Sequence, residues 1–197
     1  MTNTEPKAYK KFVITIARQH YTGGLKIGKL LAEELGVHCY DSELFTRVSG
    51  NLDGEISAVA HDLKLKSAGL YDVSKDSNVF ETQSKIINEI ADTQSCVIVG
   101  RCANYILKDR HDTISVFIHA PMEFRIKRAS SVHFMENEEL KNYLLKADEK
   151  KSEYCRNYTG HGWDDITQYD LSVNCETFGI RGCVDYLKRF LELRQSL

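Results

Sequence analysis

Two adjacent glycines, Gly23 and Gly24, stand between an apolar run at residues 12–17 and a segment, residues 24–35, whose apolar residues recur at helical spacing. This order predicts a strand, a tight loop and a helix. Glycine has no Cβ, so its backbone can approach an anion closely, and the start of a helix presents unpaired N–H groups and the positive end of its dipole. The stretch therefore predicts a loop that binds phosphate.

The predicted loop departs from the usual phosphate-binding string, which places a lysine and a hydroxyl residue after its last glycine. Here Leu25 and Lys26 follow the glycines. Leu25 offers phosphate only its backbone N–H, so Lys26 is the nearest substitute for the missing lysine. Thr22 is the hydroxyl residue nearest to that position, and we assign no side chain as a metal ligand.

Composition favours a single domain of 197 residues with a small insertion or lid. The 26 Lys+Arg against 28 Asp+Glu give a formal net charge of -2, which argues against nucleic acid or an anionic membrane as a partner. The apolar runs are shorter than the ~18 residues of a spanning helix, and no signal-peptide core is present. We predict a cytoplasmic protein, and we leave open whether it is a homo-oligomer. The six cysteines contain no C-x-x-C pair, which favours reduced, buried side chains over a zinc site.

Apolar runs and helical segments alternate, which predicts a parallel sheet with helices on both faces. Strands are expected at residues 12–17, 37–40, 95–100, 113–120 and 169–174. Helices are expected at residues 24–35, 80–92, 122 to about 157, and 180–193. The stretch at about 42–77 is interrupted by glycines and is predicted to be a helical insertion.

Ligands of such folds bind at the carboxyl ends of the strands. The residues that follow the first four predicted strands are Arg18, Asp41, Arg101 and Pro121. Guanidinium groups match phosphate oxygens with paired hydrogen bonds. Two arginines at the edge that also carries the glycine loop therefore favour a phosphate site more strongly than either feature alone.

Four segments in this order and spacing resemble the cytidylate kinase-like family of P-loop proteins: FVITIARQHYTGGLKIGKLLAEELGVHCYD, CVIVGRCANYIL, SVFIHAPMEFRIKR and YTGHGWDDITQYDLSVN. The resemblance implies an α/β, three-layer P-loop fold with a five-stranded parallel sheet between helices. It also implies a single domain at 1–197, with an acceptor-binding insertion at about 42–77 and a lid at about 129–162. The implied activity is phosphoryl transfer from ATP, with Mg²⁺, to a nucleoside monophosphate or similar small acceptor.

The resemblance assigns roles to residues by their place in the family's motifs. Donor binding falls to the loop: Gln19, His20, Thr22, Gly23, Gly24, Leu25 and Lys26. Six cations are assigned the catalytic role of stabilising charge on the transferred phosphoryl group: Lys26, Arg18, Arg101, Arg128, Lys151 and Arg156. Asp41 and Arg101 are assigned to the acceptor, and Cys102 replaces the aspartate that follows this arginine in the family.

Each of these features also has a structural explanation. The two glycines can form a plain strand-to-helix turn, Arg101 can be a surface ion-pair partner, and Asp41 can cap a helix as well as bind a ligand. Lys29 is interpreted as part of a solvated helix face. Two functions follow from the sequence. One is a small-molecule kinase. The other is a nucleotide-binding module without turnover, in which the altered loop still binds nucleotide but no longer supports phosphoryl transfer.

Overall fold

A computed structural model of the chain describes residues 9–41, 77–100 and 102–197. Five parallel strands form one sheet in the order β2-β3-β1-β4-β5. The strands are β1 Val13–Arg18, β2 His38–Tyr40, β3 Cys96–Val99, β4 Thr113–His119 and β5 Leu171–Asn174. The predicted α/β fold class with a five-stranded parallel sheet is confirmed. Because β1 is central, the loop that follows it opens at the middle of the sheet edge.

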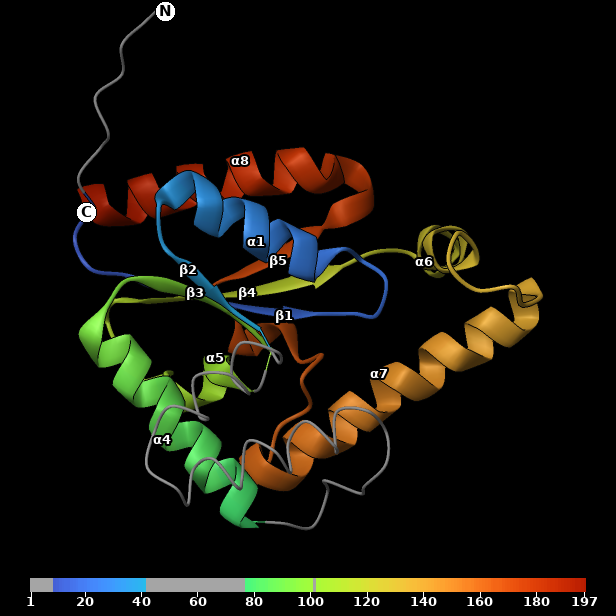
Figure 1. Ribbon diagram of the computed structural model, residues 1–197, viewed down its shortest axis with the longest axis horizontal. Helices are drawn as coiled ribbons and strands as arrows, with labels where there is room; N and C mark the ends of the chain where they lie inside the picture. Colours follow the sequence, from blue (N-terminus) through green and yellow to red (C-terminus); the bar gives the residue numbers. More distant parts are fainter. Residues whose placement is uncertain (1–8, 42–76, 101) are drawn as a thin grey trace, which may run out of the picture.

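Helices cover both faces of the sheet (Figure 1). Their bounds are α1 Gly24–Leu35, α4 Ser77–Thr93, α5 Ala103–Ile106, α6 Met122–Ser130, α7 Asn137–Thr159 and α8 Cys175–Ser196. Helices α1 and α8 pack together on one face, whereas α4 and α5 lie on the other, where the long α7 also runs (Figure 1). Of the helical insertion predicted at about 42–77, residues 42–76 lie outside the described part of the chain.

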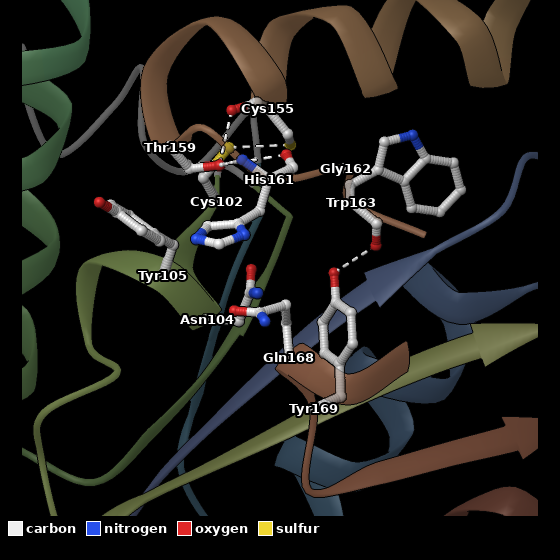
Figure 2. Close-up of a pocket in the computed structure, with 10 residues that line it drawn as sticks. All are labelled: Cys102, Asn104, Tyr105, Cys155, Thr159, His161, Gly162, Trp163, Gln168 and Tyr169. Carbon is white, nitrogen blue, oxygen red and sulfur yellow. Dashed lines mark hydrogen bonds between the residues drawn. The ribbon is translucent and has the colours of Figure 1, made fainter. Parts of the chain in front are cut away.

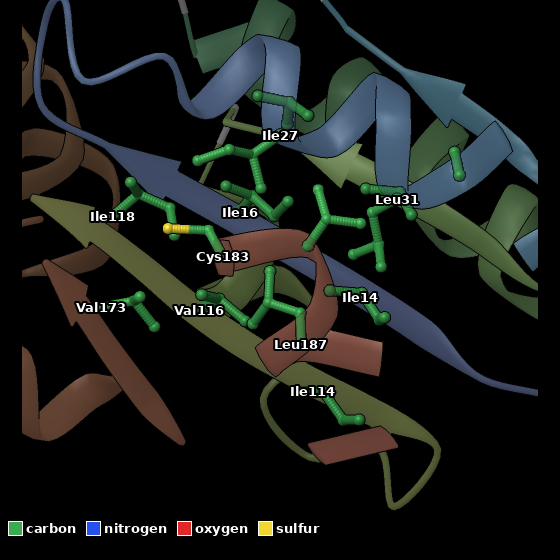
Figure 3. Close-up of a cluster of buried hydrophobic side chains, with 14 of the residues drawn as sticks. Ile14, Ile16, Ile27, Leu31, Ile114, Val116, Ile118, Val173, Cys183 and Leu187 are labelled. Atoms are coloured by element: carbon green, nitrogen blue, oxygen red, sulfur yellow. The ribbon is translucent and has the colours of Figure 1, made fainter. Parts of the chain in front are cut away.

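Strand residues point alternately to the two faces, and each face has its own core. Ile14 and Ile16 of β1 join the cluster under α1 and α8, which includes Ile27 and Leu187 (Figure 3). Val13 faces the opposite way, into a cluster with α4 and α5. Burial on both faces explains why the central strands β1, β3 and β4 are largely apolar in sequence.

The predicted single helix from 122 to about 157 is wrong, because α6 ends at Ser130 and α7 begins at Asn137. The backbone N–H of Glu136 donates to the Glu139 carboxylate at 3.3 Å, which satisfies a backbone donor at the start of the second helix. The chain end also differs from the prediction. A short 3₁₀ turn at Ile166–Gln168 precedes β5, and α8 begins at Cys175 and is interrupted at Gly179, which has φ 64°.

Gly28 on α1 provides a test of this packing. A methyl group there would lie 2.7 Å from Cγ2 of Val99 on β3, so we expect Gly28→Ala to lower the free energy of unfolding by about 1–3 kcal/mol in urea denaturation. Gly182→Ala on α8 is the matched control, because its methyl would meet only the exposed Phe178 side chain, at 3.3 Å. Equal effects of the two substitutions would contradict the close approach of α1 to β3.

Candidate functional site

The loop between β1 and α1 is held in shape by its own hydrogen bonds. The Thr22 hydroxyl is fully buried and donates to the Gln19 carbonyl at 2.9 Å. The Gln19 side-chain oxygen accepts the Ala120 N–H at 3.1 Å, which connects the loop to the end of β4. Tyr21 and Gly23 have φ values of 60° and 87°, in the left-handed region. The loop therefore turns sharply and delivers the first N–H groups of α1 to the edge of the sheet.

The Arg18 side chain occupies space left by two glycines. A Cβ on Gly24 would lie 2.6 Å from the Arg18 Cβ, and a Cβ on Gly100, just after β3, would lie 2.3 Å from its guanidinium Nη1. Gly24 and Gly100 are thus required by contact with a protein side chain. The aliphatic part of Arg18 lies against the glycine loop, and its guanidinium lies beside Gly100, just before Arg101, which itself lies outside the described residues.

Arg128 of α6 lies on the other side of the loop. Its Nη2 would be 3.1 Å from a Cβ on Gly23, and its Cζ lies 5.7 Å from the centre of the Phe124 ring. The Nε atom of Arg128 is buried and lacks a hydrogen-bond partner. A buried donor without an acceptor costs about 1–3 kcal/mol, so this guanidinium is suited to an anion bound beside the glycines.

Lys151 of α7 reaches the start of the same loop. Its ammonium donates to the Arg18 carbonyl at 3.3 Å and to Nδ1 of His20 at 3.1 Å. Burial, together with the nearby Arg18 charge, lowers the pKa of Lys151 to about 8. Burial and the Lys151 charge lower the pKa of His20 to about 4, so the imidazole is neutral and its Nδ1 accepts a hydrogen bond from the lysine ammonium. The cations here outnumber the acids that face them.

Asp148 is the carboxylate among these cations. One of its oxygens accepts the His20 N–H at 2.9 Å and lies 3.6 Å from Lys151, and the other pairs with Arg125 of α6. The Asp148 carbonyl accepts the indole N–H of Trp163 at 3.0 Å. The glycine loop, α6 and α7 therefore meet at a single side chain.

Other predicted site residues lie apart from this cluster. Leu25 and Lys26 are exposed in the first turn of α1. Asp41 is buried after β2 and pairs with Lys29 at 3.0 Å, so Lys29 is not simply part of a solvated face. Arg156 is exposed near the end of α7, where it donates to Ser152 at 3.4 Å.

Sequence reasoning missed Asp148 and the contacts of Trp163. The only signal was the spacing of Asp148 and Lys151, which places them on one helix face within a run of charges. The described residues contain no group of three His, Cys, Asp or Glu side chains able to hold a metal ion. Among the same residues, no helix has the length and apolar character needed to span a membrane.

The Asp148 contacts predict a stability effect. Asp148→Asn removes the charge that pairs with Arg125, whose side chain is 5% exposed, so we expect the free energy of unfolding to fall by about 3 kcal/mol. The control is Asp185→Asn, which breaks the pair with Arg181, where the side chains are 60% and 67% exposed. Its cost should stay below about 0.5 kcal/mol in the same urea titration. Losses of similar size would show that Asp148 does not bind these elements together.

The lowered pKa of His20 predicts a dependence of stability on pH. In the unfolded chain the imidazole takes up a proton near pH 6.5, whereas the folded state resists protonation down to about pH 4. Stability should therefore fall as the pH decreases through this window, and more steeply in the wild type than in His20→Asn, whose amide oxygen can still accept from Lys151. Urea titrations from pH 7.5 to 4 measure both slopes, and parallel curves would contradict the assignment.

Comparison with known proteins agrees with this architecture. A curated cytidylate kinase of Methanosarcina mazei is 28% identical over 182 residues, covering 89% of this chain and 93% of that protein. The cytidylate kinase of Methanosarcina barkeri is 26% identical over 185 residues, with the same coverage.

Solved structures show the same fold. An uncharacterised protein from Eubacterium ventriosum superposes with a TM-score of 0.74 at 24% identity, over 92% of this chain and 99% of that one. A shikimate kinase from Bacteroides thetaiotaomicron gives 0.58 at 18% identity, over 92% and 98%. The model of the cytidylate kinase-like family matches residues 13–177. That match spans most of the chain, which therefore belongs to the cytidylate kinase-like family.

Proposed function

We propose that this protein is a nucleotide kinase that transfers a phosphoryl group from ATP to a nucleoside monophosphate, with CMP as the first candidate acceptor. The observation that carries the proposal is the convergence of Arg18, Arg128 and Lys151 on the glycine loop at the start of α1. Phosphoryl transfer depends on positioning and on stabilising charge that develops on the transferred group. Three cations beside a helix N-terminus supply both.

The donor triphosphate binds along Gly23–Lys26 in this proposal. The N–H groups of Gly24, Leu25 and Lys26 begin α1 and have no acceptor four residues earlier within the helix. The unpartnered Nε of Arg128 lies on the same side as Gly23, which supports binding of an anion there. Lys26 is exposed and makes no ion pair with any residue that the structure describes, so its ammonium is available to the donor phosphates.

The acceptor side rests on Asp41 and Arg101. We propose that Arg101 binds the acceptor's phosphate and that Asp41 orients the rest of the acceptor. Asp41 lies at the end of β2, and β2 pairs with β3, after which Arg101 follows in the chain. We propose that about residues 129–162, which include α7 and Lys151, form a lid over the site.

Magnesium fits this site only through the phosphates. The Thr22 hydroxyl is turned into the protein and already donates to Gln19, so it is poorly suited to ligate a metal. We propose that Mg²⁺ is held by donor phosphate oxygens and water, where it would neutralise phosphate charge. Arg18, Arg128 and Lys151 then orient the phosphates and compensate their remaining charge.

A nucleotide-binding module without turnover is the second candidate. It is favoured by the loop, which lacks both the usual lysine and the usual hydroxyl residue that ligates magnesium. It is also favoured by Lys151, whose ammonium already donates hydrogen bonds to the Arg18 carbonyl and to His20. In that case the site binds nucleotide but lacks a cation that stabilises the phosphoryl group during its transfer.

One experiment separates the two candidates. The protein is incubated with ATP, Mg²⁺ and each of a panel of nucleoside monophosphates in an assay coupled to ADP formation, and its melting temperature is measured with and without ATP. We expect ATP to raise the melting temperature and CMP to support turnover. A raised melting temperature without turnover on any acceptor favours the binding module, and no response in either measurement would contradict both.

Lys26 and Lys29 on α1 provide a matched pair of variants. We expect Lys26→Ala to weaken ATP binding by roughly three- to tenfold, because its ammonium lies in the first turn of the helix. Lys29→Ala should leave ATP binding near normal and act on the acceptor, because Lys29 pairs with Asp41. Titrations with ATP and with the acceptor measure both effects. Equal, small losses of ATP affinity would mean that the loop relies on its backbone amides and Arg18.

A further inference from the structure

Two thiols from distant parts of the chain face each other near the sheet edge. Sγ of Cys102 lies 3.0 Å from Sγ of Cys155 in a hydrogen bond between residues 53 positions apart in the sequence (Figure 2). Cys102 follows the end of β3 and caps α5, whereas Cys155 lies on α7. Both cysteines are reduced, and neither belongs to the proposed phosphate-binding set.

The geometry is close to that of a disulfide. An S–S bond is about 2.05 Å long, so the two sulfur atoms need to approach by roughly 1 Å. Cys102 has φ 54°, a conformation uncommon for a residue with a side chain, and its thiol is buried. Cys155 is only half-buried, and both cysteines line a small open pocket together with His161 and Tyr169 (Figure 2). Cys155 is therefore the member of the pair that lies nearer to solvent.

The neighbours of Cys155 favour its thiolate form. The hydrogen bond from Cys102 lowers the pKa of Cys155, and the Lys151 ammonium, one helical turn earlier, acts in the same direction against the effect of burial. A thiolate, not a thiol, attacks disulfides. By contrast, burial raises the pKa of Cys39 to about 11 and that of Cys96 to about 12. A hydrogen bond with Cys183 also lowers the pKa of Cys175, but Cys175 is fully buried in the core, whereas Cys155 is only half-buried.

We propose that Cys102 and Cys155 form a reversible disulfide by exchange with a low-molecular-weight disulfide such as oxidised glutathione, and that this bond fixes α7 to the end of β3. The Cys155 thiolate attacks one sulfur of the reagent, whose S–S bond breaks and releases one thiolate. The Cys102 thiolate then attacks Sγ of the resulting mixed disulfide and displaces the second thiolate. The two cysteines lose two electrons, and the reagent gains them and takes up the two cysteine protons as two thiols.

The bond would act on the part of α7 that reaches the phosphate site. Lys151 lies one turn before Cys155 on the same helix and contacts the glycine loop. A covalent bond at Cys155 restrains this end of the lid, so we expect oxidation to slow any cycle that requires the lid to open. This consequence for turnover rests on the proposed kinase function, whereas the disulfide itself does not.

The folded full-length protein is treated with oxidised glutathione, and its thiols are counted. We expect loss of two of the six thiols, a Cys102–Cys155 cross-link in the peptide map, and full recovery with dithiothreitol. Amide exchange at residues 150–159 should slow several-fold on oxidation, with α8 unchanged. Cys155→Ser should abolish all of these effects, and the control Cys39→Ser, which alters a half-buried but unactivated thiol, should retain them.

Three results would overturn the inference. The first is that no cross-link forms, and the second is that the same number of thiols is lost when Cys155 is replaced. The third is that a bond between Cys175 and Cys183 forms equally fast. The latter two thiols also share a hydrogen bond but lie fully inside the core. Turnover is measured in the same samples, where oxidation should lower it at least tenfold. If the reduced protein phosphorylates no acceptor, the kinase proposal fails, and the thiol count and amide exchange still decide whether the disulfide forms.

Discussion

The Asp148 carboxylate joins the glycine loop to α6 and α7. It lies on α7, receives the His20 N–H from the glycine loop and pairs with Arg125 from α6. Removing a charged partner from a buried guanidinium is costly, so α6 and α7 cannot separate from the loop without a new partner for Arg125. The conformations of the three elements are therefore interdependent.

The same arrangement leaves the site short of negative charge. The charges of Arg18 and Arg125 lower the pKa values of both His20 and Lys151. The Asp148 carboxylate has the opposite effect on both groups. The lowered pKa of Lys151 expresses this imbalance. A phosphate group placed beside Lys151 would raise that pKa again, so binding of an anion near neutral or mildly alkaline pH would be accompanied by proton uptake.

The three central strands were predictable from sequence because β1, β3 and β4 are short runs rich in β-branched residues. Helix α1 was predictable because Gly23 and Gly36 delimit one helical pattern. The break between α6 and α7 was not, because residues 131–136 contain neither glycine nor proline and the new start depends on Glu136 and Glu139. The Asp148 cluster and the Lys29–Asp41 pair join residues from different elements, and such pairings follow from the folded arrangement and not from local spacing.

The space that Gly24 and Gly100 leave for Arg18 has a consequence for how this chain can vary. The first glycine belongs to the loop proposed to bind the donor, and the second leads into the segment proposed to bind the acceptor, yet an added Cβ at either would clash with the same side chain. A Cβ on Gly24 would meet the Cβ of Arg18, which every residue except glycine carries, and Gly100 has φ 86°, which favours glycine even where there is space. Shortening Arg18 would therefore free neither position, so both glycines are expected to persist in relatives that have lost the arginine.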